Sequence, residues 1–243
     1  MTAPWTPLAW DTEFFGTSIG RVELDGLDRD AILEVEAEAR AQGVACLYAA
    51  LDPIDAQLTV VVQELGYRFV EGATTFDLRL DEPAIPCPPG VTVRLGTPED
   101  LPALAEMVDG LAPWSRFAVD PRFGLEASRR MQRAWAERAL RPGSDEHELV
   151  LAEDASGAIA FITRTIHPTP RVDGVGTTAR GSGAARYLIE EARAWAAPHA
   201  LLGGPIAARN VAALRYVSHC NYRVANVRYL YHRWLDEDRA ASS

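Results

Sequence analysis

The chain has 243 residues, of which 48% are hydrophobic and 24% charged, and this composition excludes the disordered, collagen-like and mini-protein classes. A formal net charge of −10 argues against a nucleic-acid surface, because duplex binding needs clustered cations. All 24 basic residues are Arg, which excludes enzymes that depend on a Schiff-base, P-loop or kinase-type lysine. The three cysteines lie far apart and form no CxxC pair, so we expect a cytoplasmic protein with no metal and no membrane span.

Short β-rich runs alternate with amphipathic helices in the first third of the chain. The pattern predicts a strand near 19–22, a helix near 30–42 ended by Gly43, a strand near 46–51, a helix near 54–65 ended by Gly66, and a strand near 67–80. Four prolines then fall between residues 83 and 89. Because proline removes hydrogen-bond donors and stiffens the backbone, we predict a linker over residues 83–90.

The same alternation continues after the linker. Thr97 can cap a helix in which Pro98 takes the first turn and the acidic pair that follows favours the positive end. The remaining pattern predicts, in order, a strand at 91–95 before that helix, a loop at 112–124, a long helix at 125–140, a hairpin of 148–152 and 158–166, a short strand at 172–177, a helix at 183–196, a strand at 201–206, a helix at 211–220 and a strand at 222–234.

The two parts of the chain echo each other. Residues 63–80 and 218–234 both run from a helix end, through Gly66 or Asn221, into Tyr-Arg and a long alternating strand. Gly and Asn accept a left-handed helix end most readily, so the shared pattern has a physical cause. We interpret it as a weak internal repeat and predict three segments: 1–82, a linker at 83–90, and 91–243.

The stretch from Gly174 to Trp195 is the most informative part of the sequence. A β-rich run enters a turn that contains Arg180-Gly181-Ser182-Gly183 and leaves as a helix with apolar residues at helical spacing. Glycines let a ligand approach the backbone, and the first amides of a helix have no internal partner, so this turn is a candidate pyrophosphate site. Arg180 could add charge-assisted hydrogen bonds. The turn lacks the third glycine of a dinucleotide fingerprint and is no Walker motif.

The segments RGSGAARYLIEEA and NVAALRYVSHCNY, in this order, resemble the acyl-CoA turn and the following Asn-x-x-Ala helix of the Gcn5-related N-acetyltransferase (GNAT) superfamily. The opening LAWDTEFFGTSIGRV and the closing YLYHRW resemble its TDP-fucosamine acetyltransferase-like branch. The resemblance implies an α/β (α+β) protein with a tandem GNAT-like fold. A mixed central sheet would be flanked by helices, and 1–82 would be a partial N-terminal half before a complete acyltransferase half at 91–243.

The resemblance also implies a mechanism. The pantetheine arm of acetyl-CoA, or of another acyl-CoA, would lie between splayed strands at 158–166 and 172–177, and a small-molecule amine would attack the thioester directly. A backbone amide would hold the oxyanion and an acid would protonate the thiolate. The residues implied for donor binding are Val175, Thr177, Thr178, Ala179, Arg180, Gly181, Ser182, Gly183, Ala184 and Asn210.

The catalytic acid is the point at which the chain departs from the family pattern. Val217 stands where the family commonly has Tyr, seven residues after Asn210, and Tyr216 lies about 100° around the helix from it. Thr178 also stands where the family usually has Gln or Arg. The catalytic candidates are therefore Tyr216, Asn210 and His219, while Tyr216 as a packed aromatic, His219 as a surface residue and Asn210 as a helix cap stay open.

The acceptor side is defined less sharply. Trp114, Arg116 and Phe117 lie between two helices and could line a site for an anionic or sugar-nucleotide acceptor, although loop aromatics often close over a core. Possible bases for deprotonating the amine are His147, Glu148, Glu153 and His167.

Three functions remain open at this level. The first is an N-acyltransferase that uses an acyl-CoA and acts on a small-molecule amine such as an amino sugar or a specialised metabolite. The second has an acyl carrier protein as the donor, and the third is a catalytically silent ligand-binding module. We expect a monomer or homodimer that binds neither nucleic acid nor membrane.

Overall fold

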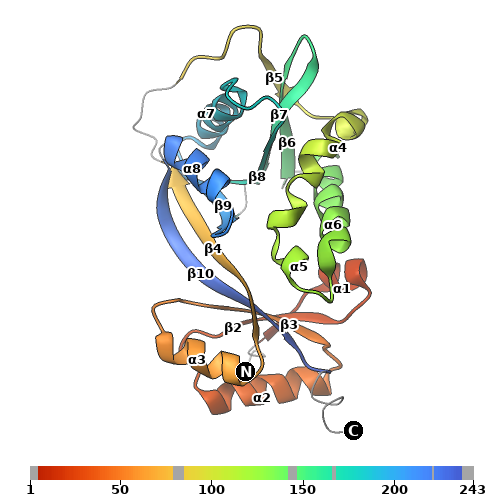
Figure 1. Ribbon diagram of the computed structural model, residues 1–243, viewed down its shortest axis with the longest axis vertical. Coiled ribbons are helices and arrows are strands. Elements are labelled where there is room, and N and C mark those ends of the chain that lie inside the picture. Colours follow the sequence, from red (N-terminus) through yellow and green to blue (C-terminus); the bar gives the residue numbers. More distant parts are fainter. Residues whose placement is uncertain (1–4, 79–84, 142–146, 166–167, 221, 237–243) are drawn as a thin grey trace. The chain divides into compact units, whose positions relative to one another are not determined.

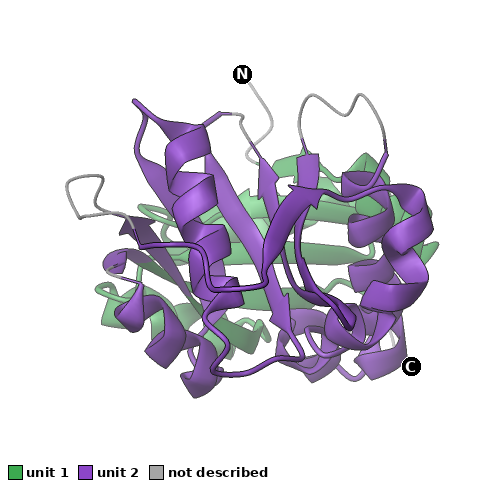
Figure 2. Cartoon of the chain, turned by 90° about the horizontal axis from the view of Figure 1, so that it is seen from above, with its two compact units in different colours: residues 1–73, 227–243 green, residues 74–226 purple. Residues whose placement is uncertain are grey.

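A computed structural model describes residues 5–78, 85–141, 147–165, 168–220 and 222–236 of the chain. The chain forms two compact units (Figure 2): unit 1 holds residues 1–73 and 227–243, and unit 2 holds residues 74–226. Strands β4 (Arg68–Leu78) and β10 (Tyr222–Trp234) contribute residues to both units. These divisions differ from the expected segments of 1–82 and 91–243, because the end of β10 pairs with β3 (Cys46–Leu51) of unit 1.

Unit 1 is a small mixed sheet with two helices on one face. Its strands follow the order β1-β2-β3-β10-β4, with β2 parallel to β3 and β3 antiparallel to β10. Its elements are β1 (Trp5–Pro7), α1 (Ala9–Phe15), β2 (Ile19–Glu23), α2 (Arg29–Ala41), β3, α3 (Ala56–Glu64), the first residues of β4 and the last of β10.

The helices of unit 1 are capped and buried as their sequences dictate. Asp28 and Asp55 cap α2 and α3, each accepting from a first-turn amide. Ile32, Val35 and Ala39 of α2 pack against the sheet together with Leu58 and Val62 of α3.

A buried ion pair ties α2 to β10 within unit 1. Glu36 accepts from Nε and Nη2 of Arg233 at 3.1 and 3.3 Å, and the two side chains are only 2% and 7% exposed. The contact holds the C-terminal strand in the N-terminal unit.

Unit 2 contains the remaining elements, and its strands follow the order β4-β9-β8-β7-β6-β5. After β4 come β5 (Thr92–Leu95), a 3-10 turn (Pro98–Asp100), α4 (Leu101–Asp109), a second 3-10 turn (Ala112–Trp114), α5 (Arg116–Val119), α6 (Gly124–Ala139), β6 (His147–Asp154), β7 (Gly157–Thr165), β8 (Arg171–Thr177), α7 (Ala184–Ala196), β9 (Leu201–Ala207), α8 (Val211–His219) and the start of β10.

Both faces of the unit 2 sheet are covered, and the alternation along β6 and β7 assigns the two faces. Leu149, Leu151 and Phe161 pack with α4 and α6, whereas Val150 and Ile162 pack with α7 and α8. Figure 1 shows α4 and α6 on one side of β6, β7 and β8 and α7 on the other. We call these two sides the α4 face and the α7 face.

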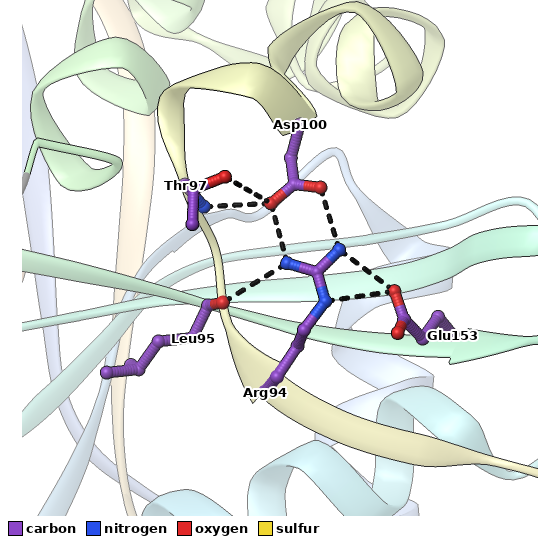
Figure 3. A network of polar contacts seen from close by, with 5 residues as sticks. All are labelled: Arg94, Leu95, Thr97, Asp100 and Glu153. Atoms are coloured by element: carbon purple, nitrogen blue, oxygen red, sulfur yellow. Dashed lines mark hydrogen bonds and ion pairs between the residues drawn. The ribbon is translucent and has the colours of Figure 1, made fainter.

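A polar network joins β5, the start of α4 and the β6 end (Figure 3). Arg94 donates to both oxygens of Asp100 at 2.7 and 2.8 Å and to Glu153 at 3.1 Å, and Asp100 also accepts from the amide of Thr97. The hydrogen bonds from Arg94 lower the pKa of Asp100 to about 2. The carboxylate of Asp100 therefore fixes the turn that the Thr97-Pro98 pattern predicts.

The helices and strands expected from periodicity are present, most with ends shifted by one or two residues. Two short elements of unit 1, β1 and α1, had no sequence prediction, and the expected loop at 112–124 contains the short helix α5. Asn221 and residues 83 and 84 of the predicted linker lie outside the described residues.

Candidate functional site

The glycine-rich turn leads from β8 into α7 as the sequence predicts. Gly181 and Gly183 have φ values of 83° and 81°, a left-handed conformation that favours glycine, and Gly183 is the N-cap of α7. A Cβ on Gly181 would have nothing within 4 Å, and one on Gly183 would have only Pro88 Cγ, at 3.4 Å. The backbone of the turn is therefore open to a ligand at Gly181.

The amides of this turn are largely unused. Thr178 N donates to Ile159 O, Ser182 N donates to Ala179 O at 3.3 Å, and Ala184 N donates to its neighbour Ser182 Oγ. Within the described part of the chain, no acceptor is in hydrogen-bond range of the amides of Ala179, Arg180, Gly181, Gly183, Ala185 and Arg186. No acidic residue stands in the first turn of α7, so the positive end of the helix is not offset there.

Strand β8 parts from β9 beside this turn. The parallel register of β8 with β9 holds the two pairs Arg171–Leu202 and Val172–Gly203, although both strands continue for several residues beyond them. By contrast, β7 and β8 are paired from Thr165–Arg171 to Ala160–Thr177. The expectation of a splay between 158–166 and 172–177 is therefore wrong, because those strands form a continuous antiparallel pair; the divergence lies one strand further along, between β8 and β9.

Three residues account for the divergence. Asp173 is an extra residue in β8, a bulge opposite the Thr163–Arg164 step of β7, and bulges bend the strand that carries them. Gly204 of β9 lies so close to the bulge that a Cβ there would be 2.9 Å from both Asp173 Cα and Val172 O. Pro205 follows and has no amide proton to donate. The strands approach as closely as backbone allows and then separate.

Asn210 and Arg209 stand at the end of β9, where α8 begins. Asn210 Oδ1 accepts from Ala213 N at 3.1 Å, so this side chain caps α8. Arg209 reaches the loop after α4 and donates to Ser115 O at 2.9 Å and to Pro113 O at 3.4 Å. The structure thus brings the predicted acceptor loop to the start of α8, and Arg209, which sequence reasoning missed, makes the connection.

The three predicted acceptor residues have different environments. Trp114 is 40% exposed and available to a ligand. Phe117 is 2% exposed and packs edge-on against Phe123, so it supports the loop from within and does not present a surface to a substrate. The guanidinium of Arg116 lies 4.7 Å from the centre of the Phe117 ring.

The predicted catalytic tyrosine is engaged by the backbone. Tyr216 Oη donates to Ala185 O in the first turn of α7 at 2.7 Å, and burial raises the pKa of Tyr216 far above its usual range. Val217, which replaces the usual tyrosine, is buried in the core with Cys220, whose pKa is also raised by burial. Helical spacing had placed Tyr216 around the helix from position 217, and it does face α7.

The other protic candidates have various environments in the structure. His219 is exposed and its Nδ1 lies 2.6 Å from Arg215 O. Glu148 pairs with Arg164, which stacks on Trp195, and Glu153 pairs with Arg94. His147 is half-buried at the start of β6, and His167 lies outside the described residues.

Sequence reasoning also missed Asp173 and Arg171 of β8. Asp173 accepts from Thr165 Oγ1 at 2.8 Å and from Arg171 Nε at 2.5 Å, at the bulge itself. Only a register shift between two strands makes Asp173 special, and a single sequence carries no signal for that.

Metal centres and membrane spans are both missing from the described residues. These residues contain no group of three or more His, Cys, Asp or Glu side chains placed to hold a metal ion. They also contain no helix with the length and apolar character that crossing a membrane requires.

Solved structures show which fold this is. The chain is similar to a GCN5-related N-acetyltransferase from Kribbella flavida, with a TM-score of 0.61 and 19% identity over 96% of this chain and 87% of that one. A GCN5-related N-acetyltransferase from Sphaerobacter thermophilus gives 0.59 and 16% over 95% and 76%. A tandem GNAT protein from the clavulanic acid biosynthesis pathway gives 0.54 and 12% over 90% and 76%.

No family model and no curated protein matches the chain. The structural likeness shows that the chain has the GNAT fold in a tandem arrangement, a mixed α/β architecture in which helices flank a large mixed sheet.

Proposed function

We propose that unit 2 is an N-acyltransferase that takes an acyl group, with acetyl as the first candidate, from an acyl-CoA and transfers it to the amine of a small molecule. One observation carries this proposal: β8 leaves β9 beside a turn in which most of the amides have no partner in the described structure. An extended arm fits the unpaired edge of a strand, and an anionic group fits the turn. The two features are adjacent, as the two ends of a phosphorylated pantetheine require.

The residues of the turn fit a pyrophosphate. Gly181 leaves open space over the backbone, and Arg180 and Arg186 are exposed beside it. The N-cap of α7 is Gly183, and the residue three positions before this glycine is Arg180. Counted from the N-cap, Arg180 takes the place that the family pattern gives to Gln or Arg, which supports a pyrophosphate at this turn.

The strand edge of β8 fits the arm and the thioester. Between Asp173 and Thr177, strand geometry points every second amide toward the side of β9, where no register is formed. One of these amides can donate to the thioester oxygen as negative charge develops on it. The amine nitrogen then forms a bond to the carbonyl carbon and the carbon–sulfur bond breaks. The products are an amide and a thiol, and one proton from the starting ammonium is released to water.

Tyr216 has a positioning role in this proposal. Its proton is already donated to Ala185 O, so the tyrosine fixes the first turn of α7 against α8. A thiol has a pKa of about 8.5, so a thiolate leaves more readily than an alkoxide and water can protonate it afterwards. Transfer therefore does not depend on a tyrosine at position 217.

The proposal is tested by offering acetyl-CoA and, separately, an acetylated acyl carrier protein together with a panel of amines. We expect transfer from acetyl-CoA and slower transfer from the carrier, because a carrier-bound donor leaves the turn without its pyrophosphate. Transfer from the carrier alone would replace the donor, and no transfer from either would overturn the proposal.

A second candidate is favoured by Val217, which is buried and has no proton to give. The protein would then bind a thioester without transferring it. Under this reading acetyl-CoA stabilises the protein against heat while no amine yields an acylated product. The two candidates differ in product formation alone, which mass spectrometry of the reaction mixture decides.

A further inference from the structure

A carboxylate and a guanidinium stand together on β8, where this strand parts from β9. Asp173 is the bulge residue of β8. Arg171 is one of the two residues of β8, with Val172, that pair with β9. Asp173 accepts a hydrogen bond from Thr165 of β7. Side chains alternate along a strand and Thr165 lies four residues after Phe161, so both are on the α4 face. A Cβ on Gly174 would also point to that face, 3.7 Å from Leu111, which directly precedes the predicted loop at 112–124 that carries the acceptor candidates.

Both charged groups can form further hydrogen bonds. Each oxygen of Asp173 accepts one hydrogen bond, one from Arg171 and one from Thr165, and a carboxylate oxygen can accept two. The side chain of Asp173 is 30% exposed and that of Arg171 39%. Arg171 uses Nε alone, and its two terminal amino groups have no partner among the described residues.

Other arginines of unit 2 show what a guanidinium does when its purpose is structural. Arg133 donates Nε and Nη2 to the two oxygens of Asp109, and Arg94 engages two carboxylates and a carbonyl. In Arg171 the two terminal amino groups, which match a carboxylate best, form no hydrogen bond with the residues that the structure describes. An exposed pair of this kind adds little to stability, so its position beside the divergence needs another explanation.

We infer that the acceptor is an amine that also carries a carboxylate, as an amino acid does: the ammonium end binds Asp173 and the carboxylate end binds the terminal amino groups of Arg171. This inference rests on the proposed transferase function and narrows its acceptor to one chemical class. Asp173 accepts an N–H of the amine, and the bulge brings it next to the strand edge that holds the thioester. Arg171 then distinguishes an amino acid from the amine that lacks its carboxylate.

The test compares matched acceptors. Phenylalanine, leucine and lysine are each paired with the amine that lacks the α-carboxylate, namely phenethylamine, isoamylamine and cadaverine, and kcat/KM is measured with acetyl-CoA as the donor. We expect the amino acid of a reacting pair to exceed its amine by about 10- to 100-fold, the value of a charge-assisted bidentate contact. Phosphoethanolamine and ethanolamine form a further pair that separates phosphate from carboxylate.

Variants locate the effect. Arg171→Met should remove the preference for the amino acid, so that the two members of a pair react with similar kcat/KM. Arg129→Met is the matched control, because Arg129 is 42% exposed, makes one ion pair and lies on α6; it should keep the preference. Asp173→Asn preserves shape and should raise KM for both members of a pair. Thermal unfolding and acetyl-CoA binding confirm that each variant is folded.

Each outcome decides the inference. Equal rates for amino acids and plain amines, a preference that survives Arg171→Met, or a stronger response to phosphoethanolamine would overturn it while the transferase proposal stands. If acetyl-CoA binds and no amine is acetylated, or if acetyl-CoA does not bind, the proposed function fails and the inference fails with it.

Discussion

Replacing Tyr216 by Phe separates a positioning role from an acid role. The change removes only the hydroxyl, whose hydrogen bond to Ala185 O spans 2.7 Å. Ala185 is the second residue of α7, so its carbonyl still receives the helical bond from the amide four residues on. No acceptor is left without a donor. The expected cost is therefore that of one net hydrogen bond, about 1 kcal/mol, or a melting temperature lower by about 2–4 °C for a chain of this size.

The assay is thermal unfolding of wild type and variant with and without acetyl-CoA, together with turnover as a function of pH. We expect the turnover rate of the Tyr216→Phe variant to stay within about threefold of wild type. Burial raises the pKa of Tyr216, so the group stays protonated through the neutral and mildly alkaline range and contributes no alkaline limb. The two pH profiles should therefore have the same shape.

Tyr222→Phe is the matched control. Tyr222 is 8% exposed and its hydroxyl has no hydrogen-bond partner among the described residues, so its removal should leave stability equal or slightly higher. If turnover by Tyr216→Phe falls about 100-fold or more while unfolding and acetyl-CoA affinity are unchanged, the positioning role is refuted and Tyr216 is restored as the acid.

Three further predictions follow from contacts elsewhere. Glu36→Leu leaves the buried guanidinium of Arg233 without its carboxylate, so urea denaturation should show a free energy of unfolding lower by about 3–5 kcal/mol. Adding Arg233→Leu should recover most of this loss. A double variant as unstable as the single one would contradict the prediction. The pKa of Asp100 is lowered to about 2, so its stabilising effect is present above its ordinary pKa of 3.8 and is lost as pH falls toward 2. Between pH 5 and 2, the free energy of unfolding of wild type should therefore fall by about 1 kcal/mol more than that of Asp100→Asn, a modest value because Arg94 is 41% exposed. Parallel plots of unfolding free energy against pH for the two proteins would count against this prediction. Arg209→Ala releases the carbonyls of the acceptor loop and should raise KM for the amine at least fivefold while KM for acetyl-CoA stays constant, and a rise confined to acetyl-CoA would show that the loop serves the donor instead.

Local chemistry made most elements of this fold predictable. The helical turn that Thr97 and Pro98 predict begins where expected. Gly43 and Gly66 end α2 and α3 in the left-handed conformation. Alternate side chains of β6 and β7 pack on opposite faces of the sheet, as the period of two along a strand predicts. These features depend on residues close in sequence, so a single chain reveals them.

Pairing between strands was less accessible. The divergence of β8 and β9 depends on a bulge at Asp173 and on Gly204 and Pro205 beyond a crossover helix, and nothing within β8 alone announces a register shift. The sequence also could not show that Phe117 is buried, because an exposed and a buried loop aromatic look alike in composition. Short elements such as β1 and α1 carry too few residues for a period to emerge.

Calorimetric titration of acetyl-CoA into wild type, Gly181→Ala and Gly157→Ala tests most directly whether the turn before α7 holds the donor. Both glycines have positive φ, 83° and 108°, and a Cβ would meet nothing within 4 Å at either, so both substitutions strain the backbone without a steric clash. We predict binding to wild type and to Gly157→Ala, with affinity at least tenfold weaker in Gly181→Ala, whose methyl group occupies the approach of the phosphates. Absence of binding to wild type, or equal affinity in all three proteins, would contradict the assignment of this turn.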